Sequence, residues 1–186
     1  MSRVIVIEFM SLDGVMQDPD GNEGTPHGGW AFRFGPGPVT GDPFGLSEVL
    51  DTGALLLGRQ TWQMFAKIWP GRDDPFSAKL NAIPKLVVSR SLDQAADWQN
   101  SAVLPGDLVT EVRKRKQEQD IVITGSASVV RTLMAHDLVD EYRLIVFPLV
   151  IGEGTRVFPD GTAPVSLALV SAQTTGPAVR LIYTRA

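Results

Sequence analysis

Two segments of the chain share one pattern, a short apolar strand followed by a tight glycine turn and then a helix. The first is Leu56–Trp62, which carries Gly58 and Arg59, and the second is Ile121–Val129, which carries Gly125. Such a turn places unpaired helix N–H groups and the positive end of the helix dipole at the carboxyl edge of a sheet, where phosphate binds well. Strand–glycine–helix junctions occur in every α/β protein. Two of them, with Arg59 at the mouth of the first, favour a ligand that carries several phosphates, such as a dinucleotide.

Composition restricts the classes of protein and of site. With 186 residues the chain is long enough to bury a core, and we expect a single domain over residues 1–186. A net charge of −4 argues against a broad nucleic-acid-binding face. The absence of cysteine excludes disulfides, a thiol nucleophile and cysteine-ligated metal. Because His27 and His136 are the only imidazoles, we expect no metal site.

Hydropathy along the chain bears on its location. No apolar run approaches the ~20 residues that span a bilayer. The first residues, Met1–Ile7, pass directly into a strand pattern and lack a cleavable signal. We therefore expect a cytoplasmic protein that binds neither membrane nor nucleic acid.

Hydrophobic periodicity predicts alternating strands and helices over most of the chain. Apolar, β-branched runs predict strands, and amphipathic runs predict helices. The predicted strands are 3–9, 54–57, 85–89, 101–104 and 121–124, and the predicted helices are 59–67, 107–118 and 126–135. From Asp140 the pattern changes to strands alone, at 141–147, 167–174 and 179–184. We therefore predict an α/β protein with a mostly parallel central sheet and antiparallel C-terminal edge strands, without internal repeats or linkers.

Residues 17–45 carry little periodicity, which predicts a long irregular loop. His27 and the aromatic residues Trp30, Phe32 and Phe34 lie within it, and this aromatic content argues against disorder. Two interpretations stay open, a static surface flap packed on its own aromatic side chains and a loop that closes over a substrate. In the second, Trp30 and His27 contact the substrate, and His27 can donate a proton near neutral pH.

The end of this loop predicts a helix. Asp42-Pro43 resembles an N-cap followed by proline at the first helical position. We expect the helix to continue to about Asp51, with an apolar face packed on the core. The residues of that face are Phe44, Leu46, Val49 and Leu50.

Several motifs, taken together, resemble those of a known family. Ser11-Leu12-Asp13-Gly14 follows the first strand, and Gly58-Arg59-x-Thr61-Trp62 follows the second. Val87–Leu92 ends a third strand, and Thr124–Ala127 forms a turn with one glycine where folate reductases have two or three. The ending comprises Asp140–Leu144, Pro148–Gly154 and Phe158-Pro159. On these motifs the chain resembles the dihydrofolate reductase-like fold over nearly its whole length. It most resembles the branch related to the riboflavin-biosynthesis reductase (the RibD C-terminal domain).

The resemblance implies a three-layer fold and a reductase that takes hydride from NADPH. The implied cofactor-binding residues are Gly58, Arg59, Thr61, Ser89, Arg90, Gly125, Ser126 and Ala127. Because Arg59 and Arg90 would follow adjacent strand ends, both can pair with phosphate oxygens, which favours the 2′-phosphate of NADPH over the hydroxyl of NADH. Alternatively, Arg59 is a surface residue at a helix start, and Trp62 is a core residue.

The resemblance also implies a pyrimidine- or pteridine-like substrate, with the ribosylamino-pyrimidine precursor of riboflavin as one candidate. Asp13 and Asp42 are the candidate catalytic residues. Asp42 lies at about the spacing before Gly58 at which folate reductases carry the acid that holds the pterin ring. Each aspartate also has a structural explanation, a helix cap for Asp42 and an Asp-Gly turn for Asp13. Dihydrofolate reductase activity, and a nucleotide-binding protein without turnover, are the alternative functions.

The tail strands predict the oligomeric state. Residues 165–174 are rich in apolar side chains that a monomer would leave partly exposed at a sheet edge. The resemblance points the same way, since reductases of the riboflavin branch commonly pair. We therefore expect a homodimer.

Overall fold

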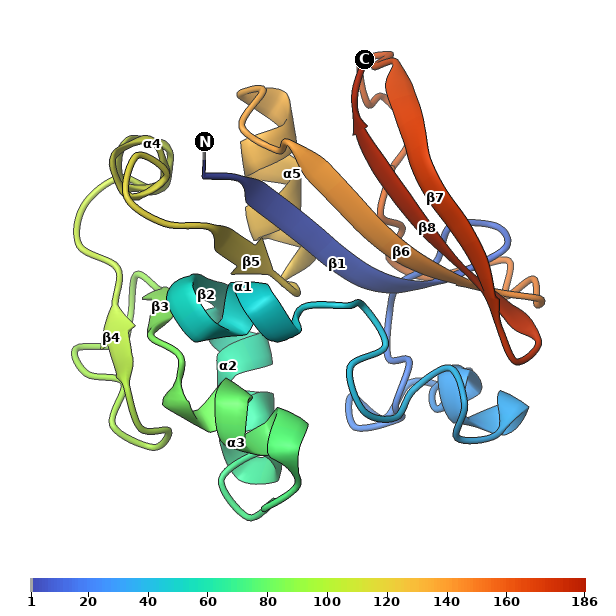
Figure 1. The fold of residues 1–186 in the computed structure, drawn as a ribbon, viewed down its shortest axis with the longest axis horizontal. Helices are drawn as coiled ribbons and strands as arrows, with labels where there is room; N and C mark the ends of the chain where they lie inside the picture. Colours follow the sequence, from blue (N-terminus) through green and yellow to red (C-terminus); the bar gives the residue numbers. More distant parts are fainter. Residues whose placement is uncertain (1) are drawn as a thin grey trace. The chain divides into compact units, whose positions relative to one another are not determined.

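The structure is a computed structural model that describes residues 2–186 and divides them into two compact units. Unit 1 comprises the residues up to Val6 together with Leu46–Val139, and unit 2 comprises Ile7–Gly45 together with Asp140–Ala186. Strand β1 (Val4–Ser11) contributes residues to both units (Figure 1).

The sheet of unit 1 is parallel throughout. Its strands lie in the order β4 (Ser101–Val103), β3 (Lys85–Val88), β2 (Ala54–Gly58), β5 (Ile121–Ile123) and the first half of β1. The β2, β5 and early β1 residues are all buried, which explains why these strands are continuous apolar runs rather than alternating ones. Gly58 pairs with Val88, and Leu56 pairs with Ile123. The carboxyl ends of β3, β2 and β5 therefore meet at one edge of this sheet.

Within the described residues, five helices complete unit 1. They are α1 (Ser47–Thr52), α2 (Arg59–Ile68), α3 (Pro75–Ala82), α4 (Leu108–Arg115) and α5 (Ala127–Ala135). Helix α2 packs against β2 and β3, α5 packs against β2, and α1 packs against α3. Trp62 on α2 is buried, and its indole N–H donates to the Ser101 hydroxyl at 3.0 Å, so it is a core residue.

The helices differ from the prediction at two places. The helix predicted from Asp42-Pro43 begins only at Ser47, because Gly45 has a φ of +66°, outside the right-handed helical region, and Asp42 is therefore not its N-cap. The four apolar side chains predicted for its buried face are nevertheless buried, namely Phe44, Leu46, Val49 and Leu50. Helix α3 was not predicted, although Asp74 before Pro75 is a standard helix start, and its carboxylate accepts the N–H groups of Phe76 and Ser77.

The strands of unit 2 are antiparallel beyond β1. Strand β6 (Glu141–Phe147) pairs with β8 (Ala178–Arg185), and β8 pairs with the edge strand β7 (Leu167–Thr175). Because β1 belongs to both units, the strand order reads β4-β3-β2-β5-β1-β6-β8-β7. The predicted α/β class, mostly parallel with antiparallel C-terminal strands, is confirmed.

An aromatic cluster forms the core of unit 2 beneath the 17–45 loop. The Phe147 ring lies 5.4 Å from Trp30, 5.7 Å from Phe34 and 5.7 Å from Phe9, centroid to centroid. Trp30 begins a short 3-10 helix, η1 (Trp30–Phe34). Such tilted and edge-on pairs stabilise by about 0.5–1.5 kcal/mol each beyond their buried area. The loop is therefore anchored at its middle.

A buried ion pair anchors the end of the same loop. Arg143 on β6 donates to the Glu141 carboxylate at 2.5 Å, and also to the backbone carbonyls of Phe44 and Gly45. Both charged side chains are buried. The Arg143 guanidinium thus fixes residues 44 and 45 to β6, and it also neutralises the charge of the Glu141 carboxylate.

Residues 2–186 contain neither a candidate membrane-spanning helix nor a candidate metal-binding cluster. Within this range no helix combines the length and the apolar character that a membrane span requires. The same range holds no cluster of three or more His, Cys, Asp or Glu residues placed to bind a metal ion.

Candidate functional site

In unit 1, two helices begin directly after neighbouring strands. Gly58 is the N-cap of α2 and Ser126 is the N-cap of α5. Gly58 has no side chain, and the Ser126 side chain makes no capping hydrogen bond, so neither helix start is capped by a side chain. The first N–H groups of a helix have no partner inside the helix, so they remain available to an anion when no side chain caps them. These two helix starts form a candidate phosphate-binding edge.

The two turns pack so closely that they require glycine. A Cβ atom on Gly58 would lie 2.2 Å from the Ser126 Oγ and 3.0 Å from its backbone nitrogen. A Cβ atom on Gly125 would lie 2.8 Å from the Thr61 Oγ1, and Gly125 also has a φ of +66°. The Gly58 N–H donates to the Gly125 carbonyl at 3.4 Å. The two glycines are therefore needed for the close packing of the two turns, and Thr61 packs against the second turn.

The basic side chains predicted for this edge lie where their strands end. Arg59 is the first residue of α2 and Arg90 follows β3, and both are exposed. A cation at a helix N-terminus opposes the helix dipole, so Arg59 is not placed there for the stability of α2. The Ser89 hydroxyl accepts the N–H groups of Ser91 and Leu92 at 3.1 and 3.0 Å, so it shapes the turn that carries Arg90.

The eight predicted cofactor residues therefore come from the ends of three adjacent strands. β3, β2 and β5 are neighbours in the sheet, and each is followed by one predicted group. The groups are Ser89 and Arg90 after β3; Gly58, Arg59 and Thr61 at the end of β2 and the start of α2; and Gly125, Ser126 and Ala127 after β5. The topology brings them to one edge, and their contact with a nucleotide stays a prediction.

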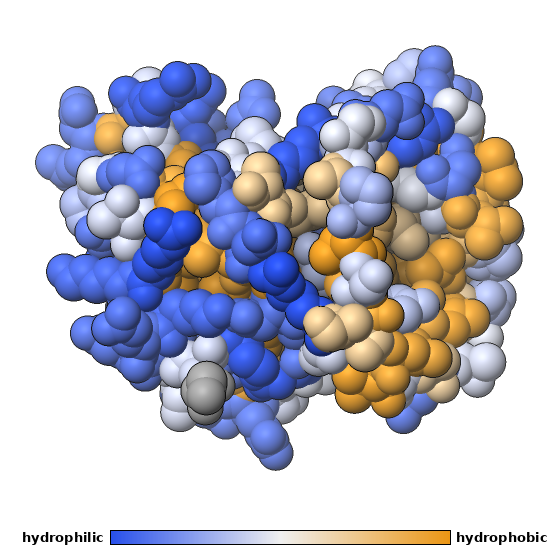
Figure 2. All heavy atoms as spheres, turned by 90° about the horizontal axis from the view of Figure 1, so that it is seen from above, coloured by the Kyte–Doolittle hydropathy of each residue, from blue (hydrophilic) through white to orange (hydrophobic). Residues whose placement is uncertain are grey.

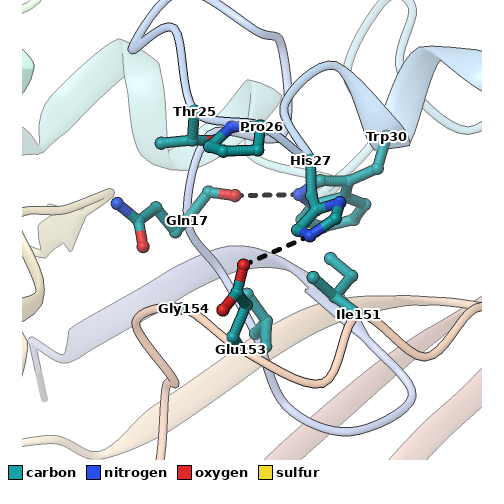
Figure 3. A pocket seen from close by; sticks show the side chains of 9 residues that line it. Gln17, Thr25, Pro26, His27, Trp30, Ile151, Glu153 and Gly154 are labelled. Atoms are coloured by element: carbon teal, nitrogen blue, oxygen red, sulfur yellow. Dashed lines mark hydrogen bonds and ion pairs between the residues drawn. The ribbon is translucent and has the colours of Figure 1, made fainter.

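Unit 2 contains a cavity of about 220 Å³, shown in Figure 3. The 17–45 loop forms one wall and the segment 151–154 the other. The lining residues are Val15, Gln17, Thr25, Pro26, His27, Trp30, Ile151, Glu153 and Gly154. His27 and Glu153 reach toward each other across the cavity, with Nε2 3.2 Å from Oε1. The cavity thus has mostly apolar walls and one ion pair.

Asp18 organises the wall formed by the 17–45 loop. Its buried carboxylate accepts the backbone N–H of Glu23 at 2.9 Å, and both the N–H and the hydroxyl of Thr25 at 2.8 and 2.7 Å. Burial alone would raise the pKa of Asp18, but these donors lower it below the ordinary value. A Cβ atom on Gly28 would lie 2.1 Å from the carboxylate, so Gly28 is required beside it.

Asp13 organises the opposite wall. Its carboxylate accepts the Ser11 hydroxyl at 2.7 Å and the N–H groups of Ile151 and Gly152 at 3.0 and 2.8 Å. The Ser11 hydroxyl first, and then the backbone donors, lower the pKa of Asp13 to about 2. A carboxylate with that pKa is not a proton donor at neutral pH. These hydrogen bonds give Asp13 a structural role in this wall, and the catalytic role predicted for it stays a prediction.

Trp30 is part of the core rather than a mobile contact. Its side chain is 1% exposed, and its indole N–H donates to the Gln17 carbonyl at 2.8 Å. One part of the residue still lines the cavity beside His27. These contacts favour the static flap over the closing loop, while contact of Trp30 and His27 with a substrate stays a prediction.

Asp42 lies away from the residues of this cavity. It lines a second, polar cavity of about 210 Å³, together with Thr40, Gln173 and Arg180 among others. Asp13 and Asp42, predicted together as catalytic, therefore do not share one cavity in unit 2. The catalytic role of Asp42 stays a prediction.

Sequence reasoning missed Glu153, the partner of His27. The residue lies within Pro148–Gly154, the segment quoted only for its resemblance to the end of a family. A glutamate between two glycines in an irregular segment carries no periodicity that would single it out. Only the spatial pairing with His27 identifies it.

A comparison with protein-family models matches residues 2–181 to the model described as the RibD C-terminal domain. The chain belongs to the RibD C-terminal domain family. The predicted resemblance is thereby confirmed. Two curated relatives, the uncharacterized proteins YyaP and YwjB of Bacillus subtilis (strain 168), are each 28% identical to the chain. YyaP aligns over 97% of this chain and 94% of its own length, and YwjB over 99% and 98%.

Solved structures of RibD-type proteins share the fold. A protein of Shewanella sp. PV-4, provisionally named for riboflavin biosynthesis, matches with a TM-score of 0.76 at 21% identity over 99% of both chains. The deaminase/5-amino-6-(5-phosphoribosylamino)uracil reductase of Thermotoga maritima matches with a TM-score of 0.61 at 14% identity. RibD of Acinetobacter baumannii matches with a TM-score of 0.59 at 17% identity. This chain is covered completely in the last two comparisons but spans 57% and 58% of those longer proteins.

Proposed function

We propose that this RibD C-terminal domain protein is an NADPH-dependent reductase that acts on a pyrimidine- or pteridine-like heterocycle. The observation that carries the proposal is the pair of strand-end turns, at which two helices start after neighbouring strands without a side-chain cap. Family membership supports a reductase, since the Thermotoga maritima relative is named as one. We infer a substrate whose heterocycle is related to that of 5-amino-6-(5-phosphoribosylamino)uracil, the compound named for the Thermotoga enzyme.

The residues of unit 1 fit the dinucleotide. The N–H groups at the starts of α2 and α5 would bind the pyrophosphate, and Arg59 and Arg90 would pair with the 2′-phosphate. When bound, NADPH supplies the hydride for the reduction. Arginine is suited to this task because its planar guanidinium can donate two parallel hydrogen bonds to a phosphate.

His27 is the residue of unit 2 that we propose as proton donor. Reduction of a carbon–nitrogen or carbon–oxygen double bond needs a proton as well as a hydride. The His27 imidazole is a group that can donate a proton, whereas the Asp13 carboxyl has a pKa of about 2. The Glu153 carboxylate, 3.2 Å from His27 Nε2, would hold the protonated ring in place.

The test is a fluorescence titration of the protein with NADPH and NADH. We expect NADPH to bind at least tenfold more tightly than NADH. Arg59→Ala should weaken NADPH binding by about 1.5–3 kcal/mol, roughly 10- to 100-fold, because a charge-assisted hydrogen bond is lost. Arg113→Ala, which removes an exposed arginine from the last turn of α4, is the matched control and should leave the affinity unchanged. Equal affinity of the wild-type protein for both cofactors would refute the phosphate role of Arg59.

We also propose a homodimer that forms through the edge of unit 2, and a cytoplasmic location. Strand β7 ends the sheet, and its side chains Leu169 and Val170 are 58% and 61% exposed. Figure 2 shows apolar side chains gathered over part of the surface. An unpaired edge strand with exposed large apolar groups is a liability that a second copy would remove.

A further inference from the structure

The cavity of unit 2 carries information about which substrates the protein accepts. Its walls are largely apolar, because Val15, Pro26, Trp30 and Ile151 line it. Val15 and Trp30 are both 1% exposed, so these walls are part of a fixed core. A flat ring system is the kind of ligand that such walls bind well, whereas a solvated ionic group is not.

The charges on the cavity favour neutral ligands. Among the described residues that line it, His27 and Glu153 are the two that can carry a charge, and they are paired with each other. Glu153 is 73% exposed at its side chain and lines the cavity, so its carboxylate is accessible to a ligand there. A carboxylate there repels a phosphate and can accept a hydrogen bond from a ring N–H or an amino group.

The surroundings add negative charge. Residues 12–32 contain Asp13, Asp18, Asp20 and Glu23 but no lysine or arginine. The pKa of Glu23 is raised, first by burial and then by the nearby negative charge of Asp18.

Arg33 and Arg156 are the arginines nearest in sequence to the residues that line the cavity, and both donate hydrogen bonds to backbone carbonyls. Arg33 donates to the Gly28 carbonyl at 3.1 Å. Arg156 donates to the carbonyls of Asp13 and Gly152 at 3.1 and 3.3 Å. Both guanidinium groups therefore have a structural use in the loops that form the cavity.

We propose that this cavity selects an unphosphorylated, uncharged heterocycle that carries a ring N–H or amino donor, and that Glu153 excludes the phosphorylated form. The inference rests on the proposed reductase function. It separates this protein from its Thermotoga maritima relative, whose named substrate carries a phosphoribosyl group. Glu153 is the specificity-determining residue, with His27 as its partner.

The experiment compares 5-amino-6-ribosylaminouracil with its 5′-phosphate. Binding to the full chain is measured by calorimetry in the presence of NADPH, and turnover is measured by loss of NADPH absorbance. We expect the unphosphorylated compound to bind at least tenfold more tightly. Glu153→Gln should bring this ratio close to one, and Glu153→Lys should reverse it. Glu118→Gln, an exposed glutamate after α4, is the matched control and should leave the ratio unchanged. The preference should also weaken as salt is raised, because an exposed charge is screened.

The outcomes separate this inference from the proposed function. Tighter or equal binding of the phosphorylated compound by the wild-type protein would overturn the inference, and so would failure of both compounds to bind. Either result leaves NADPH binding and its dependence on Arg59 intact. Selective binding of the unphosphorylated compound, lost in Glu153→Gln, without oxidation of NADPH would support the inference and refute the reductase activity.

Discussion

The strand-end turn at Gly58 offers a direct test of the phosphate-binding edge. In Gly58→Ala the new Cβ atom would lie 2.2 Å from the Ser126 Oγ, 2.8 Å from its Cβ and 3.0 Å from its backbone nitrogen. Rotation of the hydroxyl relieves only the first contact, so the backbone of the second turn must move. The backbone of Gly58 itself is extended (φ −68°, ψ 154°), a conformation that alanine adopts freely. The effect of the substitution is therefore purely steric.

Overpacking of this kind costs about 1–3 kcal/mol of folding stability. The displaced turns would also misplace the N–H groups of two helix starts. We expect NADPH affinity to fall roughly 10- to 100-fold, the equivalent of losing one or two phosphate hydrogen bonds. Urea denaturation measures the loss of folding stability, and fluorescence titration of the folded protein with NADPH measures the loss of affinity.

Gly53 provides a matched control at the opposite end of the same strand. A Cβ atom there would lie 2.8 Å from the carbonyl oxygens of Asp120 and Val49, and its φ of −94° imposes no left-handed strain. Gly53→Ala should therefore destabilise the fold to a similar extent and leave NADPH affinity unchanged. Ser126→Gly combined with Gly58→Ala should recover stability, because it removes two of the three close contacts. If Gly58→Ala binds NADPH as tightly as the wild-type protein, the phosphate groups do not lie at this edge.

Three further predictions concern stability and assembly. Burial lowers the pKa of Lys85 to about 8 from the ordinary 10.5, so unfolding takes up a proton between these values. Stability measured by denaturation should rise from pH 8 to pH 10.5, by roughly 3 kcal/mol at most, and Lys85→Met should abolish the rise. Trp30→Ala should cost about 3–5 kcal/mol and leave NADPH affinity unchanged, whereas a loss of turnover in a variant of normal stability would favour the closing loop. Light scattering at micromolar concentration should give twice the mass of one chain, and Leu169→Asp should give one chain; a monomeric wild-type protein would refute the dimer.

The sequence predicted those parts of the fold that depend on local pattern. The strand–glycine–helix segments after β2 and β5 appear as predicted, because an apolar run, a glycine and a helix start are all encoded within a few residues. Asp42-Pro43 carried an equally local helix signal, and it failed. The adjacent Gly45 takes a left-handed conformation, while Arg143, 98 residues away, binds its carbonyl. Tertiary contact decided that boundary.

Buried charges lay beyond the reach of sequence patterns for a related reason. Lys85 reads as an exposed residue at the start of a strand, yet it is 1% exposed. Its ammonium group donates to the carbonyls of Asn81, Ile83 and Gln99 and lies 4.4 Å from the centre of the Trp98 ring. Three carbonyl acceptors and an aromatic face can hold a buried ammonium, but their convergence is a property of the folded chain.

The same reasoning explains why the candidate site of unit 2 was only half predicted. Asp13 is a carboxylate that a sequence motif offers as chemistry, yet backbone donors surround it. Asp18 on the other side of the cavity is held in the same way, so each carboxylate fixes one wall. Asp13 reaches N–H groups 138 and 139 residues away. Because their hydrogen bonds hold the walls in place, little ordering cost should accompany the binding of a ligand. Among the described residues that line the cavity, His27 and Glu153 are the two that can carry a charge, and the proposed selectivity rests on this pair.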